Sequence, residues 1–303
     1  MPSRPKHIIV LCGSTTRRGA GWHVQDLVRA AEARGHRVDP CAWQRLTGNV
    51  EAAGPIACDG QIILDEADVV LLRTIPPGSL EQIVFRMDLV QRLEAAGVAV
   101  FNRPRAVEVA VDKYLALTRM QQAGLPVPPT AVCQRLEDAT AAFGRFGGDV
   151  VVKPIFGSEG FGVARVSDPA LAERFFATLQ RMGSVIYVQR YIEHGGCDMR
   201  LFVLGDRVVA AMDRCGEDFR TNIAQGGVGR SVRPDATACD LARRAAAACD
   251  VAIGGVDIVT DRGGDRYVLE INAVPGWRTL SRVAEVDIAS EIIDWVVQQG
   301  TSQ

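Results

Sequence analysis

The stretch that decides the fold spans residues 256–272 and reads VDIVTDRGGDRYVLEIN. It predicts two strands joined by a tight turn, because the pair Gly263-Gly264 tolerates the positive φ that a two-residue hairpin loop requires. Counting outward from that loop places Val259 opposite Val268. The same count brings the acidic positions of the two strands into register.

In this register the carboxylates of Asp257 and Glu270 face each other, and Asn272 shares their face because side chains alternate along a strand. Facing carboxylates destabilise a sheet, so the arrangement favours a bound cation. An oxygen set without cysteine or histidine indicates Mg²⁺ or Mn²⁺ rather than zinc. The alternative is a slipped register with both acids in solvent. The opposite face is predicted to be core and carries Val256, Ile258, Leu269 and Ile271.

The composition bounds the class of protein. The chain has 303 residues, enough for two domains or three small ones, and a net charge of −2 that provides no general attraction to nucleic acid or membrane. Eight cysteines without a C-x-x-C pair predict reduced, mostly buried thiols. No apolar run suits a secretory signal or a membrane span, so we expect a cytoplasmic location. A homo-oligomer is compatible with the sequence.

The first hundred residues alternate between apolar runs and helical patterns. Strands are predicted at 7–12, 69–72 and 98–101, with helices at 22–34 and 79–93, the second opened by a capping box. This β-α-β-α-β order indicates an open, mostly parallel sheet. No G-x-G-x-x-G follows the first strand, so a substrate platform is expected rather than a dinucleotide fold.

A stiff connection at 126–129 follows a helix expected at 112–124 and suggests a domain seam. The next strand ends at Lys153 and leads into the loop Gly157-Ser158-Glu159-Gly160, which is not a Walker A motif. Small residues there allow backbone N–H groups to approach phosphate, and Lys153 could meet it as a point charge. The alternative is an ordinary glycine turn.

The C-terminal half is predicted to hold a strand at 185–192, a hairpin of 198–203 with 208–213, and helices at 236–251 and 288–297. An arginine-rich loop follows the hairpin. Such a loop is either a solvated face or a site for bidentate capture of phosphate or carboxylate. Its polar members are Arg214, Arg220, Asn222, Arg230 and Arg233.

Several motifs follow one another in a fixed order along the chain. They are Lys113, Lys153 with Gly157-Ser158-Glu159-Gly160, Gln189-Arg190-Tyr191-Ile192, Gly196-x-Asp198-x-Arg200, Phe219-Arg220-x-Asn222, Gly226-Gly227, Asp257, and Glu270-x-Asn272 with Pro275-Gly276. This order resembles the ATP-grasp superfamily and, within it, the RimK-like amino-acid ligases. The motifs cover the chain from about residue 102 to its end, and the first third matches only in outline.

The resemblance implies an α/β (α+β) ATP-grasp fold in three parts: an N-terminal α/β lead-in domain at 1–101, a central subdomain at 102–185 and a C-terminal subdomain at 186–303. ATP would lie between the last two. By position, Lys113, Lys153 and the loop 157–160 would hold its phosphates. The backbone of Gln189, Arg190, Tyr191 and Ile192 would receive adenine, and Asp198 would meet the ribose side. Arg200 would also belong to the nucleotide site. Arg220 and Asn222 would face the reacting end, and Asp257, Glu270 and Asn272 would carry Mg²⁺. Many relatives have an acid where this chain has Arg190.

The implied reaction is ATP-dependent amide formation through an acyl phosphate. The run 73–88, and the runs 111–114 and 272–278, look like those of tetrahydromethanopterin α-L-glutamate ligases. The implied partners are therefore ATP, L-glutamate and an acidic acceptor, with a pterin coenzyme favoured. Arg73 and Arg86 are expected to be solvated and to recognise that acceptor, although an ordinary capped amphipathic helix would explain them equally well.

Other activities stay open at this point. Relatives with the same fold glutamylate a ribosomal protein tail, a deazaflavin coenzyme or a carrier protein, and the near-neutral charge disfavours a highly basic ribosomal partner. An ATP-binding sensor or a kinase would use much of the same site. The complete set of Asp257, Glu270 and Asn272 argues against a degenerate module.

Overall fold

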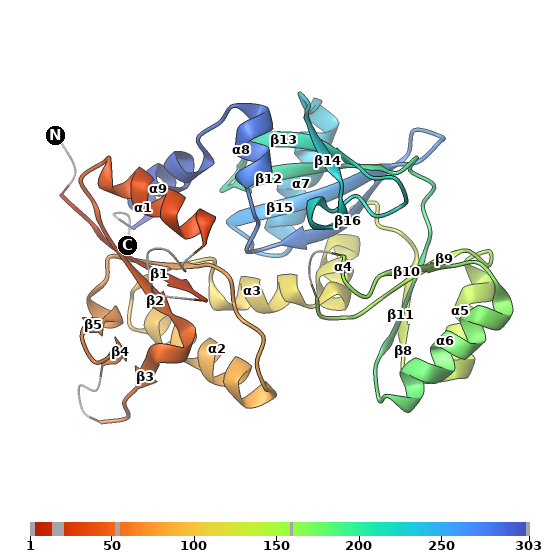
Figure 1. Cartoon of the computed structure of the whole chain (residues 1–303), viewed down its shortest axis with the longest axis horizontal. Helices are drawn as coiled ribbons and strands as arrows, with labels where there is room; N and C mark the ends of the chain where they lie inside the picture. The colour runs from red at the N-terminus through yellow and green to blue at the C-terminus, as the bar shows by residue number, and fades with distance from the viewer. Residues whose placement is uncertain (1–3, 14–20, 52–54, 158–159, 301–303) are drawn as a thin grey trace.

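The structure is a computed structural model that describes residues 4–13, 21–51, 55–157 and 160–300. Its first sheet is four-stranded, parallel throughout and ordered β2-β1-β6-β7, as the β-α-β-α-β pattern predicts (Figure 1). The strands are β1 (His7–Cys12), β2 (Arg37–Ala42), β6 (Val69–Leu72) and β7 (Ala99–Phe101), with helices α1 (Trp22–Glu32) and α2 (Leu80–Ala95). The capping box that opens α2 is present, with the Ser79 side chain accepting from the Gln82 N–H.

The first unit also contains elements that the apolar pattern did not predict. They are strand β2 and a small antiparallel sheet of β3, β4 and β5. The small sheet has two or three residues per strand, too few to show a periodic pattern. Its elements are β3 (Leu46–Gly48), β4 (Ile56–Cys58) and β5 (Ile62–Ile63), with the 3-10 helices η1 (Trp43–Arg45) and η2 (Leu64–Glu66).

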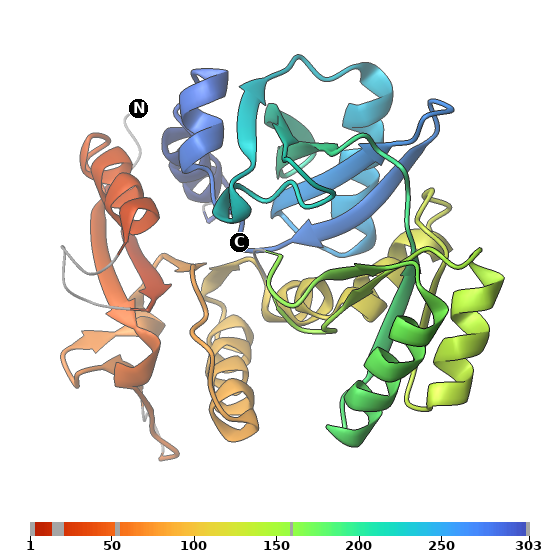
Figure 2. The same ribbon diagram turned by 45° about the vertical axis from the view of Figure 1, so that its right-hand side comes forward.

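A second unit is built on the antiparallel sheet β10-β9-β11-β8. Two helices, α5 and α6, pack side by side against it, with Phe143 and Phe176 in its own core (Figure 2). Helices α3 and α4 connect this unit to the first. The elements are α3 (Pro104–Val111), α4 (Lys113–Gln122), β8 (Thr130–Cys133), α5 (Leu136–Arg145), β9 (Val150–Lys153), β10 (Ala164–Val166), α6 (Pro169–Arg181) and β11 (Ile186–Arg190).

The third sheet has five antiparallel strands in the order β14-β13-β12-β15-β16. One face packs on α4 and α7, and the other shares a core with α1, α8 and α9. Its elements are β12 (Cys197–Leu204), β13 (Arg207–Cys215), η3 (Ile223–Gln225), β14 (Val228–Ser231), α7 (Ala236–Ala248), β15 (Ile253–Thr260), β16 (Arg266–Asn272), α8 (Arg278–Ala284) and α9 (Ile288–Gln299).

The decisive hairpin, β15-β16, differs from the prediction in its turn. The loop is five residues long, 261–265, and Val259 pairs with Tyr267 rather than with Val268. A register shift next to Asp257 then restores the predicted Asp257–Glu270 pair. Because a bulge adds one unpaired residue, it exchanges the faces beyond it. Val268 therefore enters the core in place of Leu269, which instead lines a cavity.

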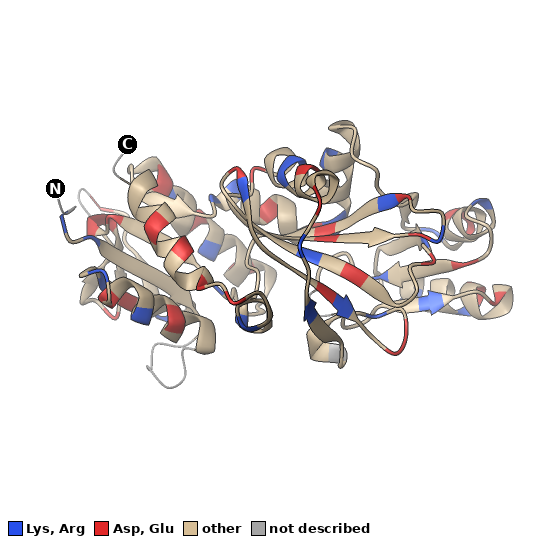
Figure 3. Ribbon diagram, turned by 90° about the horizontal axis from the view of Figure 1, so that it is seen from above, with Lys and Arg blue, Asp and Glu red and all other residues tan. Residues whose placement is uncertain are grey.

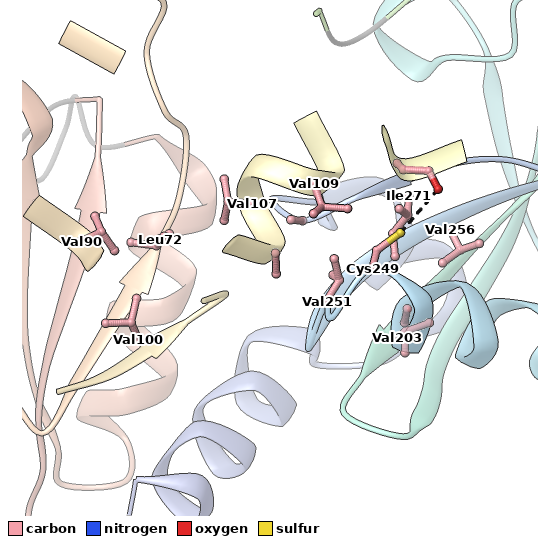
Figure 4. Packing of buried hydrophobic residues seen from close by; sticks show 14 of the residues in the cluster. Leu72, Val90, Val100, Val107, Val109, Val203, Cys249, Val251, Val256 and Ile271 are labelled. Carbon is pink, nitrogen blue, oxygen red and sulfur yellow. Dashed lines mark hydrogen bonds between the residues drawn. The ribbon is translucent and has the colours of Figure 1, made fainter. Parts of the chain in front are cut away.

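One continuous core joins the first sheet to the third. Figure 4 shows α3 between them, with Val107 and Val109 placed between Val90 of α2 and Ile271 of β16. Asn102 adds a polar bridge: its side chain accepts from the Ala252 and Ile253 N–H groups and donates to the Ile253 and Ala273 carbonyls. The predicted boundary at residue 101 stays a prediction, but buried apolar side chains and hydrogen bonds join the segments on either side of it.

The last helix also packs on the first unit. In Figures 1 and 2, α9 lies beside α1. Arg29 of α1 pairs with Asp287, and Arg34, just after α1, pairs with Asp294. Basic and acidic residues are interspersed over both halves of the molecule (Figure 3). Within the described residues no helix combines the length and apolarity that crossing a membrane would need.

The prediction that all cysteines are reduced is wrong at one pair. Cys197 and Cys215 form a disulfide between β12 and β13, with their Cα atoms 4.2 Å apart. They are directly opposite in the register, and the flanking Gly216 N–H donates to the Gly196 carbonyl. Cysteines at a non-hydrogen-bonded pair of this kind lie close enough to bond. Eighteen residues separate them, so sequence spacing gave no sign of the pairing.

Candidate active site

A cavity of about 110 Å³ has walls from the second and third units. Most of the predicted site residues line it. They are Lys113, Lys153, Gly157, Gly160, Gln189, Arg190, Tyr191, Ile192, Asp198, Arg220, Asn222, Asp257 and Glu270. Arg200 and Asn272 are not among the lining residues, and Ser158 and Glu159 lie outside the described residues.

Two lysines converge on this cavity from different elements. Lys113 follows Asp112, the N-cap of α4, and its Nζ donates to the Gly157 carbonyl at 2.8 Å. Lys153 ends β9, as the strand pattern predicts. Burial lowers the pKa of both ammonium groups, and the Glu270 carboxylate acts against that shift. The pair offers concentrated positive charge for an anion.

The segment after β11 forms one wall through its backbone. The Arg190 N–H donates to the Pro129 carbonyl at 2.8 Å and the Tyr191 N–H to the Asp149 carbonyl at 3.0 Å. Within the described part of the chain, the Ile192 N–H has no backbone acceptor. The wall therefore keeps a donor for a planar ligand edge, as an adenine subsite needs.

The side chains of this wall are held by the protein. Gln189 is buried and donates to the Thr130 hydroxyl at 2.9 Å, so its side chain helps to hold β11 against β8. Arg190 reaches the Tyr267 hydroxyl at 3.4 Å. The Arg165 guanidinium lies 3.6 Å from the centre of the Tyr191 ring, an orientation that fixes this aromatic wall.

A buried chain of charges crosses the floor of the cavity in the order Asp198, Arg214, Asp257, Arg200. Arg214 holds Asp198 through two hydrogen bonds and lies 2.7 Å from Asp257, which is also bidentate to Arg200. Burial opposes ionisation of Asp257, but the two arginines hold the pKa of its carboxyl well below its usual range. All four side chains are therefore fixed by strands of the third sheet: Asp198 and Arg200 by β12, Arg214 by β13 and Asp257 by β15.

The prediction that Arg214 belongs to the arginine-rich loop is wrong. Arg214 lies on β13 and is 3% exposed. The predicted strand ended at residue 213, one residue before Arg214, because an arginine interrupts the apolar pattern even when it is buried. Alternation from Ala210 through Met212 to Arg214 carries the missed signal, since these three share one face.

The remaining carboxylate, Glu270, has a different environment. Burial raises the pKa of its carboxyl, and Asp257 raises it further. No hydrogen bond or ion pair to Glu270 occurs among the described residues, where no cluster of three or more His, Cys, Asp or Glu side chains is found either. Asn272 Oδ1 accepts from the Val274 N–H at 2.8 Å. Glu270 is unpaired, and the Asp257 carboxylate, although it accepts from Arg200 and Arg214, keeps a lone pair of its roughly four. With the Asn272 amide oxygen, these two carboxylates fit a hard divalent cation.

The loop from residue 216 to 227 brings Arg220 and Asn222 to the cavity. It is tightly folded on itself: a Cβ at Gly227 would lie 2.2 Å from the Thr221 carbonyl oxygen, so this position requires glycine. Arg220 pairs with the exposed Asp218 and is itself solvent-accessible. An exchangeable partner leaves its guanidinium available for an incoming anion.

The expectation that Arg73 and Arg86 are solvated is wrong. Arg73 is 6% exposed, donates to the Pro275 carbonyl at 2.9 Å and lies 4.5 Å from the centre of the Trp277 ring. Arg86 is 5% exposed and donates to the Pro76 carbonyl at 2.7 Å. Arg73 is covered by the later segment around Trp277, and Arg86 folds back on the Pro76–Gly78 segment that precedes α2.

The comparison with protein families agrees with this geometry. A RimK-like ATP-grasp domain matches residues 110–296, and a RimK PreATP-grasp domain matches residues 7–107. The chain therefore belongs to the RimK-like ATP-grasp family and is an ATP-grasp ligase.

Individual relatives are similar over most of their length. Tetrahydromethanopterin:alpha-L-glutamate ligase of Methanosarcina acetivorans is 30% identical over 78% of this chain and 82% of its own. Ribosomal protein bS6–L-glutamate ligase of Salmonella newport is 32% identical over 71% of this chain and 72% of its own. Among solved structures, the ATP-grasp ligase PsnB complexed with minimal precursor has a TM-score of 0.76 at 25% identity, covering 96% of this chain and 98% of its own.

Proposed function

We propose that this chain is an ATP- and Mg²⁺-dependent ligase that adds L-glutamate to a carboxylate of an acidic small-molecule coenzyme of the tetrahydromethanopterin type. The observation that carries the proposal is the convergence of Lys113, Lys153, Asp257 and Glu270 on one cavity. Two cations and two carboxylates in one cavity suit a polyphosphate held together with a metal ion.

The lysines bind the triphosphate. Burial lowers the pKa of both ammonium groups, and nearby carboxylates only partly offset this effect. A bound polyphosphate would supply the missing negative charge. The Ile192 N–H, left without a backbone acceptor among the described residues, would meet the adenine edge. Because that contact uses backbone atoms, the replacement of the family's acid by Arg190 does not remove it.

Asp257, Glu270 and Asn272 would hold the metal ion. When bound, Mg²⁺, or Mn²⁺ in its place, neutralises charge on the phosphates and orients them for in-line transfer. Arg200 and Arg214 keep Asp257 ionised and fix its orientation, and they are positioning residues in this scheme.

In the reaction, an acceptor carboxylate oxygen attacks the γ-phosphorus and ADP departs, which leaves an acyl phosphate. The amine of L-glutamate then attacks the acyl carbon, the amide bond forms, and inorganic phosphate and a proton are released. Arg220 would neutralise the acyl phosphate, and Asn222 on the same loop would orient it. The chain supplies positioning and electrostatic stabilisation rather than a covalent nucleophile.

The acceptor is proposed from the relatives that bear the tetrahydromethanopterin ligase name and match 78% and 85% of this chain. The test incubates the protein with ATP, Mg²⁺, L-glutamate and each of three acceptors: a tetrahydromethanopterin-type pterin, a peptide with the bS6 C-terminal sequence, and an unrelated acidic peptide. Products are analysed by mass spectrometry, and ADP is quantified.

We expect one glutamyl unit on the pterin and ADP in equal amount. A glutamylated bS6 peptide with an unmodified pterin would instead assign a protein acceptor, an outcome that the 32% identity to the bS6 ligase makes worth including. ADP formation without any amide product would refute ligase activity on these acceptors.

A further inference from the structure

His194 lines the nucleotide cavity but takes no part in the steps above. We propose that His194 recognises the ribose of the nucleotide by accepting a hydrogen bond from one of its hydroxyl groups. The inference deepens the proposed function and rests on it, because it names the residue that selects ribonucleotides. It also departs from the role that the family resemblance implies for Asp198.

The tautomer of His194 follows from its one hydrogen bond. Its Nδ1 lies 2.9 Å from the Cys197 carbonyl oxygen, which can only accept, so Nδ1 carries the proton. In the neutral imidazole, Nε2 is then an acceptor. Among the described residues no partner of Nε2 is found, and the half-buried ring lies on the cavity wall.

The position of the ring is fixed from two sides. The carbonyl that orients it belongs to Cys197, which the disulfide joins to Cys215. On the other side, the Tyr191 ring lies 5.9 Å away at a tilt of 57°. Tyr191 belongs to the segment proposed for adenine, and Asp198 lies beyond Cys197. His194 therefore stands between the base end and the charged floor, where the sugar of a bound nucleotide must pass.

Asp198 is poorly suited to the same task in this chain. Its two carboxylate oxygens accept from Nε and a terminal nitrogen of Arg214, and each of these two side chains is only 4% exposed. A ribose hydroxyl donates best to an acceptor that is accessible and unused. Asp198 instead orients Arg214, which in turn pairs with Asp257.

The experiment measures dissociation constants of the full chain for ATP, 2′-deoxy-ATP and 3′-deoxy-ATP by calorimetry. The variants are His194→Phe, which keeps a ring but removes the acceptor, His194→Gln, which restores one, and Asp198→Asn as the competing candidate. The wild type should bind ATP about three- to tenfold more tightly than one of the two deoxynucleotides, the effect of one neutral hydrogen bond.

His194→Phe should lose this preference through weaker ATP binding alone, with the Kd of that deoxynucleotide unchanged, and His194→Gln should recover part of it. Asp198→Asn should keep the preference. The inference is overturned if His194→Phe discriminates like the wild type, if Asp198→Asn abolishes discrimination, or if the wild type binds all three nucleotides equally. Failure to bind any of them would instead refute the proposed function, a distinct result.

Discussion

Asp257→Asn and Glu270→Gln are nearly isosteric changes at facing positions of one hairpin. Only Asp257→Asn should lower the stability of the metal-free protein. Asp257 is 3% exposed in its side chain and is the acidic partner of Arg200, which is 10% exposed. Arg214 keeps Asp198 when Asp257 is neutralised, but among the described residues Arg200 has no second carboxylate within ion-pair distance. Leaving one buried charge unpaired costs about 3–5 kcal/mol.

Glu270→Gln should not destabilise the metal-free protein. Glu270 has no ion-pair partner among the described residues, and both burial and Asp257 disfavour its charged form. Removing that charge relieves the repulsion, so the free energy of unfolding should stay constant or rise. This contrast corrects the simpler expectation that either change merely relieves a repulsion between facing acids.

The assay is urea denaturation in EDTA, with ligase activity measured in parallel in Mg²⁺. Both variants should be inactive, because each removes a proposed metal ligand. Only Asp257→Asn should shift the denaturation midpoint to lower urea. Two results would refute the ion pairing of Asp257 with Arg200 and Arg214. One is an equal denaturation midpoint for Asp257→Asn and the wild type, and the other is an equally large fall of the midpoint in Glu270→Gln.

Three further predictions concern other parts of the chain. Lys153→Met should weaken ATP binding by about 1–3 kcal/mol in calorimetry, the range for a charge-assisted contact; unchanged affinity would remove Lys153 from the phosphate site. His23, whose Nε2 accepts from the Trp277 backbone N–H, has its pKa lowered from 6.5 to about 4, chiefly by burial. Its folded-state pKa is depressed, so wild-type stability should fall as pH drops from 6.5 toward 4, and His23→Gln should flatten that slope in pH-dependent denaturation; an unchanged slope would show that another group titrates. Thiol titration of the denatured, unreduced chain should count six thiols, whereas eight would exclude the bond between Cys197 and Cys215.

The local sequence predicted those elements whose pattern is long and regular. The apolar runs of β1 and β6, the capping box of α2 and the facing pair Asp257–Glu270 are present as predicted. The two strands and the capping box depend on residues within a few positions of one another. The Asp257–Glu270 pair is present although the predicted turn was wrong, because the bulge beside Asp257 restores that register.

What the sequence could not reveal depends on contacts between distant segments. Arg73 ends a strand, and only the approach of Trp277, two hundred residues later, buries it. Arg214 belongs to a strand because Asp198 and Asp257 pair with it across the sheet. The bulge that exchanges Leu269 for Val268 has no local signal, since both are apolar and either fits a core. Buried arginines and bulges are fixed by tertiary packing, which periodicity does not record.

In the proposed reaction an acceptor carboxylate is activated by phosphorylation before the amide forms. The most direct measurement supplies the acceptor with its carboxylate oxygens labelled by the heavy oxygen isotope and follows the label by mass spectrometry of the released phosphate. An acyl phosphate transfers one carboxylate oxygen to phosphorus, so inorganic phosphate should carry one labelled oxygen for each amide formed. Unlabelled phosphate released alongside the glutamylated product would contradict the account.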